Sequence, residues 1–170
     1  SRADAANTLE AVQLYLEQHP DGEHFDEATD KMKMLNANTV TPEDKILVGT
    51  VFDGLFQSLN NRDENGLMNS FSPLIAKFLG KANATRSDVV TFMHKIYKSD
   101  VASMNWMSLE DYAITKKEVG DQQYEYTVVF SGLQKVEHTD NSSSETRFRF
   151  NAKVNPDGRI TELNMTKILE

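Results

Sequence analysis

The sequence of 170 residues contains no cysteine. Disulfide bonds, thiolate catalysis and zinc or iron–sulfur sites held by cysteine are therefore excluded. No apolar run reaches the length of a membrane span, so we expect no direct membrane insertion of this segment, and no signal peptide is recognisable. The chain begins at Ser1 without a methionine, which leaves open whether a signal or an anchor precedes it.

Basic residues are scarce relative to acidic ones, 18 against 26, which gives a formal net charge of −8 and a pI near 5.0. Nucleic acids and anionic membranes attract basic surfaces, so this balance argues against both as partners. The hydrophobic share of 39% is enough for a sizeable core at this length, and we expect one domain with an appendage.

Familiar catalytic and metal-binding motifs are also missing. The sequence has no Ser–His–Asp order, no phosphate-binding glycine loop and no helix pattern with two histidines at metal-ligand spacing. His19 and His24 stand among Asp21, Glu23 and Asp26, but without a defined ligand spacing. A hydrated turn explains this cluster better than a metal site, and we expect neither a metal nor a cofactor.

What the chain does contain is a run of predicted antiparallel strands over residues 101–170. Tyr126, Val128 and Phe130 share one face of a half-buried strand, because polar residues alternate with them. Residues 147–154 alternate in the same way, and a longer, less regular strand spans about 101–118. The sequence therefore predicts four antiparallel strands. The bend and the turns between them are predicted at residues 108–111, 120–121, 140–144 and 155–158.

Two amphipathic helices with explicit N-caps precede these strands. Thr41-Pro42-Glu43-Asp44 offers an N-cap residue, a proline at the first helical position and an acid at the third. Residues 85–88 form a similar N-capping pattern before the second helix. Between them, residues 60–63 end the first helix and cap a short one, and residues 71–79 are typical of a short edge strand. The apolar stripes of the two helices comprise Val48, Val51, Phe52, Leu55 and Leu59, and Val89, Phe92, Met93, Ile96 and Tyr97.

The order of these elements resembles that of the nuclear transport factor 2-like superfamily, also called the cystatin-like α+β cone. The resemblance covers about residues 41–170, from the capped helix that ends in residues 59–63, through Phe71-Ser72-Pro73, to the meander that closes on residues 160–163. It implies an α+β fold in which a bent antiparallel sheet wraps around a long helix, after an N-terminal helical hairpin. It also implies a ligand-binding pocket between helix and sheet, and a homodimer formed through the outer sheet face.

The N-terminal part, residues 1–40, is predicted to be that helical hairpin. Apolar residues recur at helical spacing on both sides of a turn at residues 19–22, and a short linker at residues 36–40 is a candidate domain boundary. The hairpin resembles one unit of the short helical repeats in bacterial envelope proteins. This resemblance favours a bacterial source and an envelope location, although the sequence alone does not fix the compartment.

The superfamily contains ketosteroid isomerases, polyketide cyclases and scytalone dehydratase beside many non-catalytic binding modules, so the fold does not decide the function. A catalytic member would need an ionisable group in the apolar cone, where desolvation tunes its pKa. Asp53 and His94 are the catalytic candidates, and both fall beside the apolar stripes of their helices. A solvated flank position explains Asp53 better, and a boundary histidine explains His94 better.

Four aromatic residues are candidates for lining a ligand pocket, because each combines an apolar ring with a hydrogen-bond donor. Core packing is the more common role of such residues on a half-buried sheet. The candidates are Tyr97, Trp106, Tyr112 and Tyr126.

Arg147, Arg149 and Lys153 form a basic ladder that alternates with Phe148 and Phe150. Because the phenylalanines must contact the helices, we expect the ladder on the outer face of the sheet. Cross-strand pairs with acidic residues explain it better than an anionic ligand, and a dimer interface is the second explanation.

The sequence therefore predicts a non-catalytic ligand-binding or protein-interaction domain of a larger bacterial protein. A small apolar or amphipathic molecule would bind between the helices and the concave sheet, or a protein partner would bind the domain. One alternative is an isomerase, dehydratase or cyclase in which His94 or Asp53 abstracts a proton while Tyr97 or Tyr126 steadies the enolate. Another is a structural dimerisation module.

Overall fold

The computed structural model describes residues 39–169. The hairpin predicted for residues 1–40 therefore lies outside the described residues, except for its last two. No helix within residues 39–169 is long and apolar enough to cross a membrane. The elements of this part are, in chain order, α4 (Pro42–Asn60), α5 (Glu64–Asn69), β1 (Leu74–Phe78), β2 (Lys81–Thr85), α6 (Arg86–Ile96), β3 (Val101–Ser108), β4 (Ala113–Gly120), β5 (Gln123–His138), β6 (Ser143–Val154) and β7 (Ile160–Lys167).

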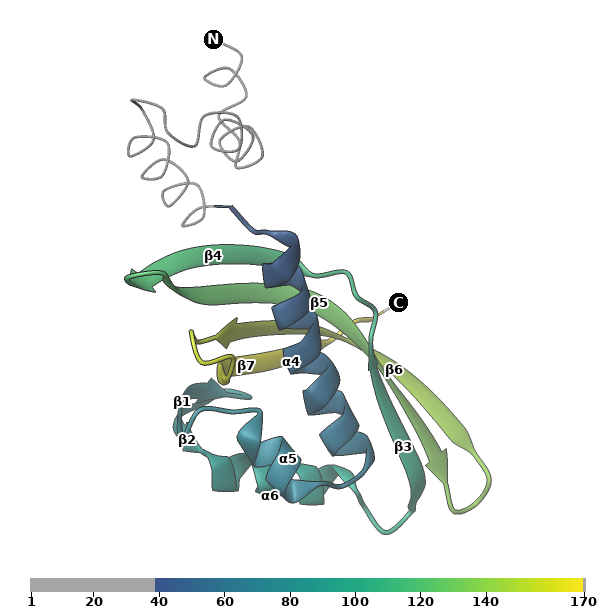
Figure 1. Cartoon of the computed structure of the whole chain (residues 1–170). Coiled ribbons are helices and arrows are strands. Elements are labelled where there is room, and N and C mark those ends of the chain that lie inside the picture. Colours follow the sequence, from purple (N-terminus) through teal and green to yellow (C-terminus); the bar gives the residue numbers. More distant parts are fainter. Residues whose placement is uncertain (1–38, 170) are drawn as a thin grey trace, which may run out of the picture.

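The seven strands form one sheet in the order β2-β1-β7-β6-β5-β3, and β4 pairs with β5 as well. Neighbouring strands are antiparallel except β1 and β7, which run parallel. The sheet curves around α4, and α5 and α6 lie near the C-terminal end of that helix (Figure 1). The predicted α+β fold, with a bent sheet wrapped around a long helix, is confirmed.

The meander predicted for residues 101–170 is confirmed, with its first strand divided in two at the predicted bend. β3 pairs with the second half of β5, and β4 pairs with the first half. Between them Asp111 Oδ1 accepts a hydrogen bond from Ser131 N at 2.6 Å, and Leu109 N donates to Ser131 O at 2.9 Å. These two bonds replace the strand-to-strand hydrogen bonds that are absent between β3 and β4. The chain therefore changes direction there while the backbone N–H and C=O of Ser131 stay paired.

The capping box predicted at the start of α4 is present. Asp44 N donates to Thr41 Oγ1 at 3.1 Å, and Thr41 N donates to Asp44 Oδ2 at 2.8 Å. Pro42 occupies the first turn, where its missing N–H costs nothing. The helix buries the predicted Val48, Phe52, Leu55 and Leu59, and also Phe56, which lies at the margin of the predicted stripe. Phe56 is buried because the sheet curves around both flanks of the helix.

The strands before α6 were predicted incompletely. The extended segment expected within residues 71–79 forms β1, but β1 pairs with β7 on one side and β2 on the other, so it is not an edge strand. The edge is β2, whose sequence contains no large apolar residue and whose only buried residue is Ala84. Leu79 and Gly80, both with positive φ, make the tight turn between the two strands.

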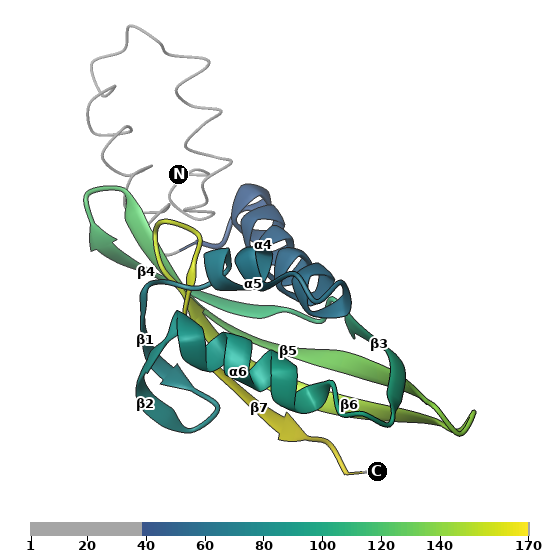
Figure 2. The same ribbon diagram turned by 90° about the horizontal axis from the view of Figure 1, so that it is seen from below.

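α6 begins directly after β2 at the second predicted cap, where Thr85 N donates to Asp88 Oδ2 at 2.8 Å. It buries Val89 and Met93 in the core. Figure 2 shows α4, α5 and α6 on one side of the sheet. The helices therefore cover the concave face, and the outer face is left to the polar residues of the strands.

Candidate functional site

The interior of the cone is filled by aromatic rings from the helix and the sheet. Phe56 stacks on Trp106 with ring centroids 6.2 Å apart, and Phe130 stacks on Phe150 at 5.0 Å. The cavity that these rings and their apolar neighbours leave between the helices and the sheet measures about 20 Å³. Sites for small molecules usually measure about 300–1,000 Å³. The interior is therefore packed as a protein core is packed.

The wall of this small cavity carries no ionisable side chain. A general acid or base acting in the cone would have to present a carboxyl, imidazole or phenol group there. Among residues 39–169 none does. The wall consists of Leu55, Phe56, Leu59, Leu67, Phe71, Phe78, Leu79, Val89, Phe92, Trp106, Phe150, Leu163 and Met165.

Trp106, the only tryptophan of the chain, is held in place by its backbone and its ring. Asn60 at the end of α4 accepts from Trp106 N at 2.6 Å and donates to Trp106 O at 3.0 Å. The indole Nε1 donates to Met104 Sδ at 3.1 Å, and the residue is 3% exposed. The indole donor is thus engaged within the protein.

The most elaborate polar cluster of the described chain lies at the other end of α4. Tyr126 donates its hydroxyl hydrogen to Asp44 Oδ1 at 2.5 Å, and Lys116 Nζ lies 2.8 Å from Asp44 Oδ2. The Lys116 side chain is 2% exposed and that of Asp44 is 11% exposed. A carboxylate of the capping box therefore also forms a buried ion pair with β4 and a hydrogen bond with β5.

The pKa values of this cluster follow from its bonds. Burial disfavours the charged form of Asp44, but hydrogen bonds from Lys116, Thr41 and Tyr126 outweigh it and hold the pKa of the carboxyl below its ordinary value of 3.8. Burial and the neighbouring Asp44 carboxylate raise the pKa of Tyr126 far above its ordinary range. Asp44 is thus a carboxylate at neutral pH and Tyr126 a neutral donor.

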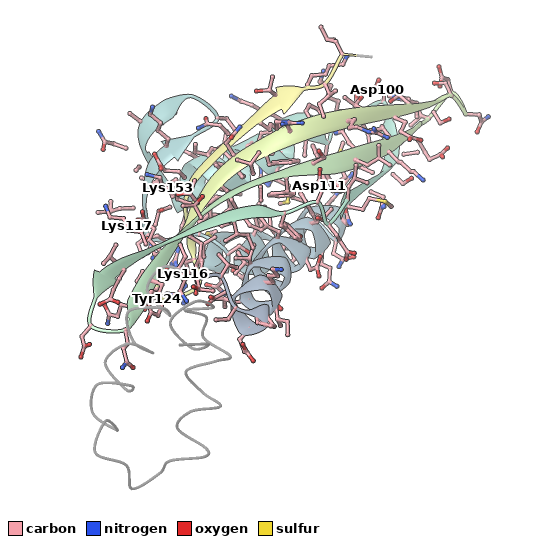
Figure 3. All side chains as sticks on the ribbon, turned by 90° about the horizontal axis from the view of Figure 1, so that it is seen from above. Asp100, Asp111, Lys116, Lys117, Tyr124 and Lys153 are labelled. Carbon is pink, nitrogen blue, oxygen red and sulfur yellow. The ribbon has the colours of Figure 1, made fainter. Side chains whose placement is uncertain are left out.

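Lys116 is surrounded on the remaining sides as well. Its Nζ donates to Thr39 O at 3.2 Å and stands 4.1 Å from the centre of the Tyr124 ring. Figure 3 shows Lys116 and Tyr124 together where β4 and β5 meet the start of α4. Because the ammonium is already bound by Asp44, Thr39 and Tyr124, this cluster joins α4 to the β4–β5 hairpin, and Lys116 is not an exposed nucleophile.

Sequence reasoning missed this cluster. Asp44 was interpreted only as a capping acid, whereas Lys116 belongs to a strand 72 residues away in the chain. One signal was present in the pattern of β4: Lys116 follows Tyr112 and Ile114 in the inward-facing phase. A lysine at an inward-facing position needs a buried partner, because an unpaired buried charge is costly.

The two catalytic candidates, Asp53 and His94, both lie on exposed surfaces of their helices. His94 Nε2 is 2.7 Å from Glu64 Oε1, and the His94 side chain is 64% exposed. The Asp53 side chain forms no hydrogen bond or ion pair within residues 39–169. Neither residue belongs to the wall of the apolar cavity.

The four aromatic candidates are not brought together. Trp106 lies in the cavity wall and Tyr126 in the cluster around Asp44. Tyr97 donates its hydroxyl hydrogen to Leu59 O at 2.6 Å, at the opposite end of α4. Tyr112 lies in the break between β3 and β4.

Tyr112 differs from the other three because its hydroxyl is buried without a hydrogen-bond partner among the described residues. Its ring lies 5.1 Å from that of Phe130. Burial raises the pKa of Tyr112, and the charges of Asp53, Glu110 and Asp111 raise it further, whereas the nearby Ser108 hydroxyl lowers it. Ser108 Oγ is outside hydrogen-bonding geometry for Tyr112 and accepts instead from Glu110 N.

The basic ladder lies on the outer face, and Lys153 forms an expected cross-strand pair. Lys153 Nζ is 3.2 Å from Glu162 Oε2 on β7. Arg149 lies near Asp111. Burial raises the pKa of the Asp111 carboxyl, but hydrogen bonds from Ser131 and the positive charge of Arg149 outweigh burial, so the pKa is lowered. The cross-strand pairing predicted for this ladder therefore accounts for Lys153.

Comparison with known proteins extends the assignment of the fold. No family model and no curated protein matches the sequence. A nuclear transport factor 2-like superfamily protein from Salmonella enterica serovar Typhimurium aligns at a TM-score of 0.60 and 12% identity, covering 74% of this chain and 92% of that one. Hexachlorocyclohexane dehydrochlorinase LinA-type3 from Novosphingobium barchaimii aligns at 0.57 and 9%, covering 75% and 88%.

A protein of unknown function from Exiguobacterium, also described as nuclear transport factor 2-like, aligns at a TM-score of 0.50 and 18% identity, covering 71% of this chain and 99% of that one. At such identities the similarity establishes the fold and leaves the activity open. The sequence-based assignment of the fold is confirmed. The chain has the nuclear transport factor 2-like, cystatin-like cone fold.

Proposed function

We propose that this chain is a non-catalytic interaction domain of a larger protein, and that the cone interior is its structural core. The observation that carries the proposal is the interior itself. About 20 Å³ is free there, and the wall is apolar throughout. A reaction in the cone would need both space for a substrate and a group that moves a proton.

The outer face of the sheet supports a binding role. Thr127, Asn151 and Asn164 alternate with core residues on β5, β6 and β7, so neighbouring strands present polar side chains on one broad surface. Such a surface suits a partner that is held by hydrogen bonds and ion pairs. A homodimer through this face is the form of the proposal that needs no other protein.

A site-specific photocrosslinker tests the proposal. The photoreactive residue replaces Asn151 at the centre of the outer face, and in a control it replaces Lys98 in the turn after α6. We expect discrete adducts of the full chain from position 151 in the source cells, either with itself or with one defined protein, and none from position 98. A monomer in solution that forms no adduct from Asn151 would contradict the proposal.

A second form of the proposal is the capture of a small apolar or amphipathic molecule inside the cone. It would require Phe56 and Trp106 to separate, because their stacked rings now occupy the space. The energetic cost of separating these rings makes this form the less favoured one.

An enzymatic function is the alternative, since one of the similar structures is a dehydrochlorinase. The unpartnered Tyr112 hydroxyl near Asp53 is the observation that favours it. Asp53→Asn and His94→Ala test this alternative together. If turnover of any isomerase, dehydratase or cyclase substrate is found, a loss of at least about 100-fold in kcat/KM would support it, as expected for general acid–base residues. Unchanged turnover in both variants would exclude these two residues as the acid–base groups.

A further inference from the structure

A surface groove beyond the C-terminal end of α4 carries side chains of opposite charge. Its volume is about 250 Å³, and it is lined by Arg62, Glu64, Met93, His94 and Tyr97. The residues come from the turn after α4, the start of α5 and the end of α6. The groove lies outside the cone interior, so its occupancy is independent of the proposed function.

Arg62 is held in one orientation without an acidic partner. Its Cζ lies 4.0 Å above the centre of the Tyr97 ring, and the Tyr97 hydroxyl is fixed by its bond to Leu59 O. Residues 39–169 provide no ion pair to the Arg62 guanidinium. A flat guanidinium without an acidic partner is suited to a carboxylate, which it can bind through two parallel hydrogen bonds.

Glu64 provides the opposite charge two residues later in the chain. Its Oε1 lies 2.7 Å from His94 Nε2, and the Glu64 side chain is 50% exposed. The second carboxylate oxygen forms no hydrogen bond within the described part of the chain and remains open to a donor. His94 therefore positions Glu64, and Glu64 can accept from an ammonium group.

Met93 contributes little apolar surface to the groove. The residue is 2% exposed, so only a small area of its side chain faces the groove and the remainder is fixed in the core. A ligand that complements the two charges of the groove carries an anionic group and a cationic donor close to it. We propose that this groove binds a free α-amino acid, with its carboxylate on Arg62 and its ammonium on Glu64.

Isothermal titration of the full chain with the twenty L-amino acids tests this inference, with L-leucine as the first probe. We expect saturable binding of L-leucine at one site per chain. 4-Methylpentanoate lacks the ammonium and 3-methylbutylamine lacks the carboxylate, so each should bind at least about tenfold more weakly, as lost charge-assisted hydrogen bonds imply.

Two variants locate the site. Arg62→Asn removes the guanidinium while keeping a residue that tolerates the positive φ of 54° at this position. Glu64→Gln keeps the shape of the side chain and removes its charge. Each should weaken L-leucine at least about tenfold. Lys95→Ala, an exposed basic residue of α6 outside the groove, should leave the affinity unchanged.

Three results would overturn the inference: no amino acid gives saturable heat, neither Arg62→Asn nor Glu64→Gln weakens the binding, or 4-methylpentanoate binds as well as L-leucine. The last result would identify a site for simple anions. Urea unfolding of both variants ensures that a loss of binding is not a loss of fold.

Discussion

Asp44 has two roles that depend on the same carboxylate. It completes the capping box of α4 with Thr41, and it accepts bonds from Lys116 and Tyr126 of the hairpin. A buried charge that loses its partner costs far more than an exposed pair contributes. The stability of the domain should therefore be unusually sensitive to these three side chains.

Lys116→Met is the most direct change, because methionine keeps most of the stem and removes the ammonium. The Asp44 carboxylate would then be buried without its cation, and we expect the free energy of unfolding to fall by about 3–5 kcal/mol. Urea unfolding measures this change. Lys117→Met, at the next and exposed position of β4, is the matched control and should stay within about 0.5 kcal/mol of the parent. Equal effects of the two variants would contradict the assignment of a buried pair.

The same carboxylate predicts a pH dependence. The pKa of Asp44 is lowered in the folded chain, so its contribution to stability is present above the ordinary pKa of 3.8 and is lost as the pH falls through the lower folded value. Asp44→Asn should therefore cost much less stability at about pH 2 than at about pH 6. Urea unfolding at both pH values checks this, with Glu43→Gln as the exposed control from the same helical turn. A cost that does not depend on pH would contradict it.

At the scale of elements, alanine substitutions at two glycines should change stability in opposite directions, one through helix propensity and the other through packing. Apart from its neighbours in the chain and the backbone of its own helix, a Cβ at Gly54 of α4 would meet no atom within 4 Å. A Cβ at Gly132 of β5 would lie 2.6 Å from Phe150 Cε2 and 3.4 Å from Met107 O. Gly54→Ala should raise the free energy of unfolding by about 0.5–1 kcal/mol, since alanine is the better helix former.

Gly132→Ala should lower the free energy of unfolding by about 1–3 kcal/mol, because the Phe150 ring is packed and cannot move aside without strain. Thermal and urea unfolding of this variant and of Gly54→Ala give the two signs. An unchanged free energy of unfolding in Gly132→Ala would contradict the close packing of Phe150 in the cone interior.

The elements also show what a sequence can specify. The caps at Thr41 and Thr85 were predicted because their bonds join residues three apart. The break near Asp111 was predicted from an interruption of the alternating pattern. β2 was not, because its pairing with β1 depends on the turn at Leu79 rather than on an apolar pattern of its own. The fold was therefore largely predictable where local rules decide it.

The candidate sites were less predictable, because they join distant parts of the chain. Lys116 meets Asp44 across 72 residues, and His94 meets Glu64 across 30. His94 and Tyr97 were candidates for a pocket in the cone, although a boundary position was favoured for His94 and core packing for Tyr97. In the structure both line a surface groove together with Arg62. Helical spacing located the flank on which His94 lies, but it could not show what faces that flank.

For the molecule as a whole, the decisive question is whether the cone encloses a core or a site. Phe56→Ala would remove the ring that stacks on Trp106 and should leave an apolar cavity able to hold a small aromatic molecule. The variant should also lose about 3–5 kcal/mol of stability. The interior cavity of the wild-type chain, which measures about 20 Å³, should admit none.

The measurement that tests this claim most directly is ¹⁹F NMR of the full chain labelled with 5-fluorotryptophan, since Trp106 is its only tryptophan. A titration with benzene, and then with a panel of amphipathic molecules, should leave the Trp106 resonance of the wild-type chain unmoved. The resonance of the Phe56→Ala variant should shift saturably with benzene. A saturable shift of the wild-type resonance would contradict the account, because the cone would then be a binding site.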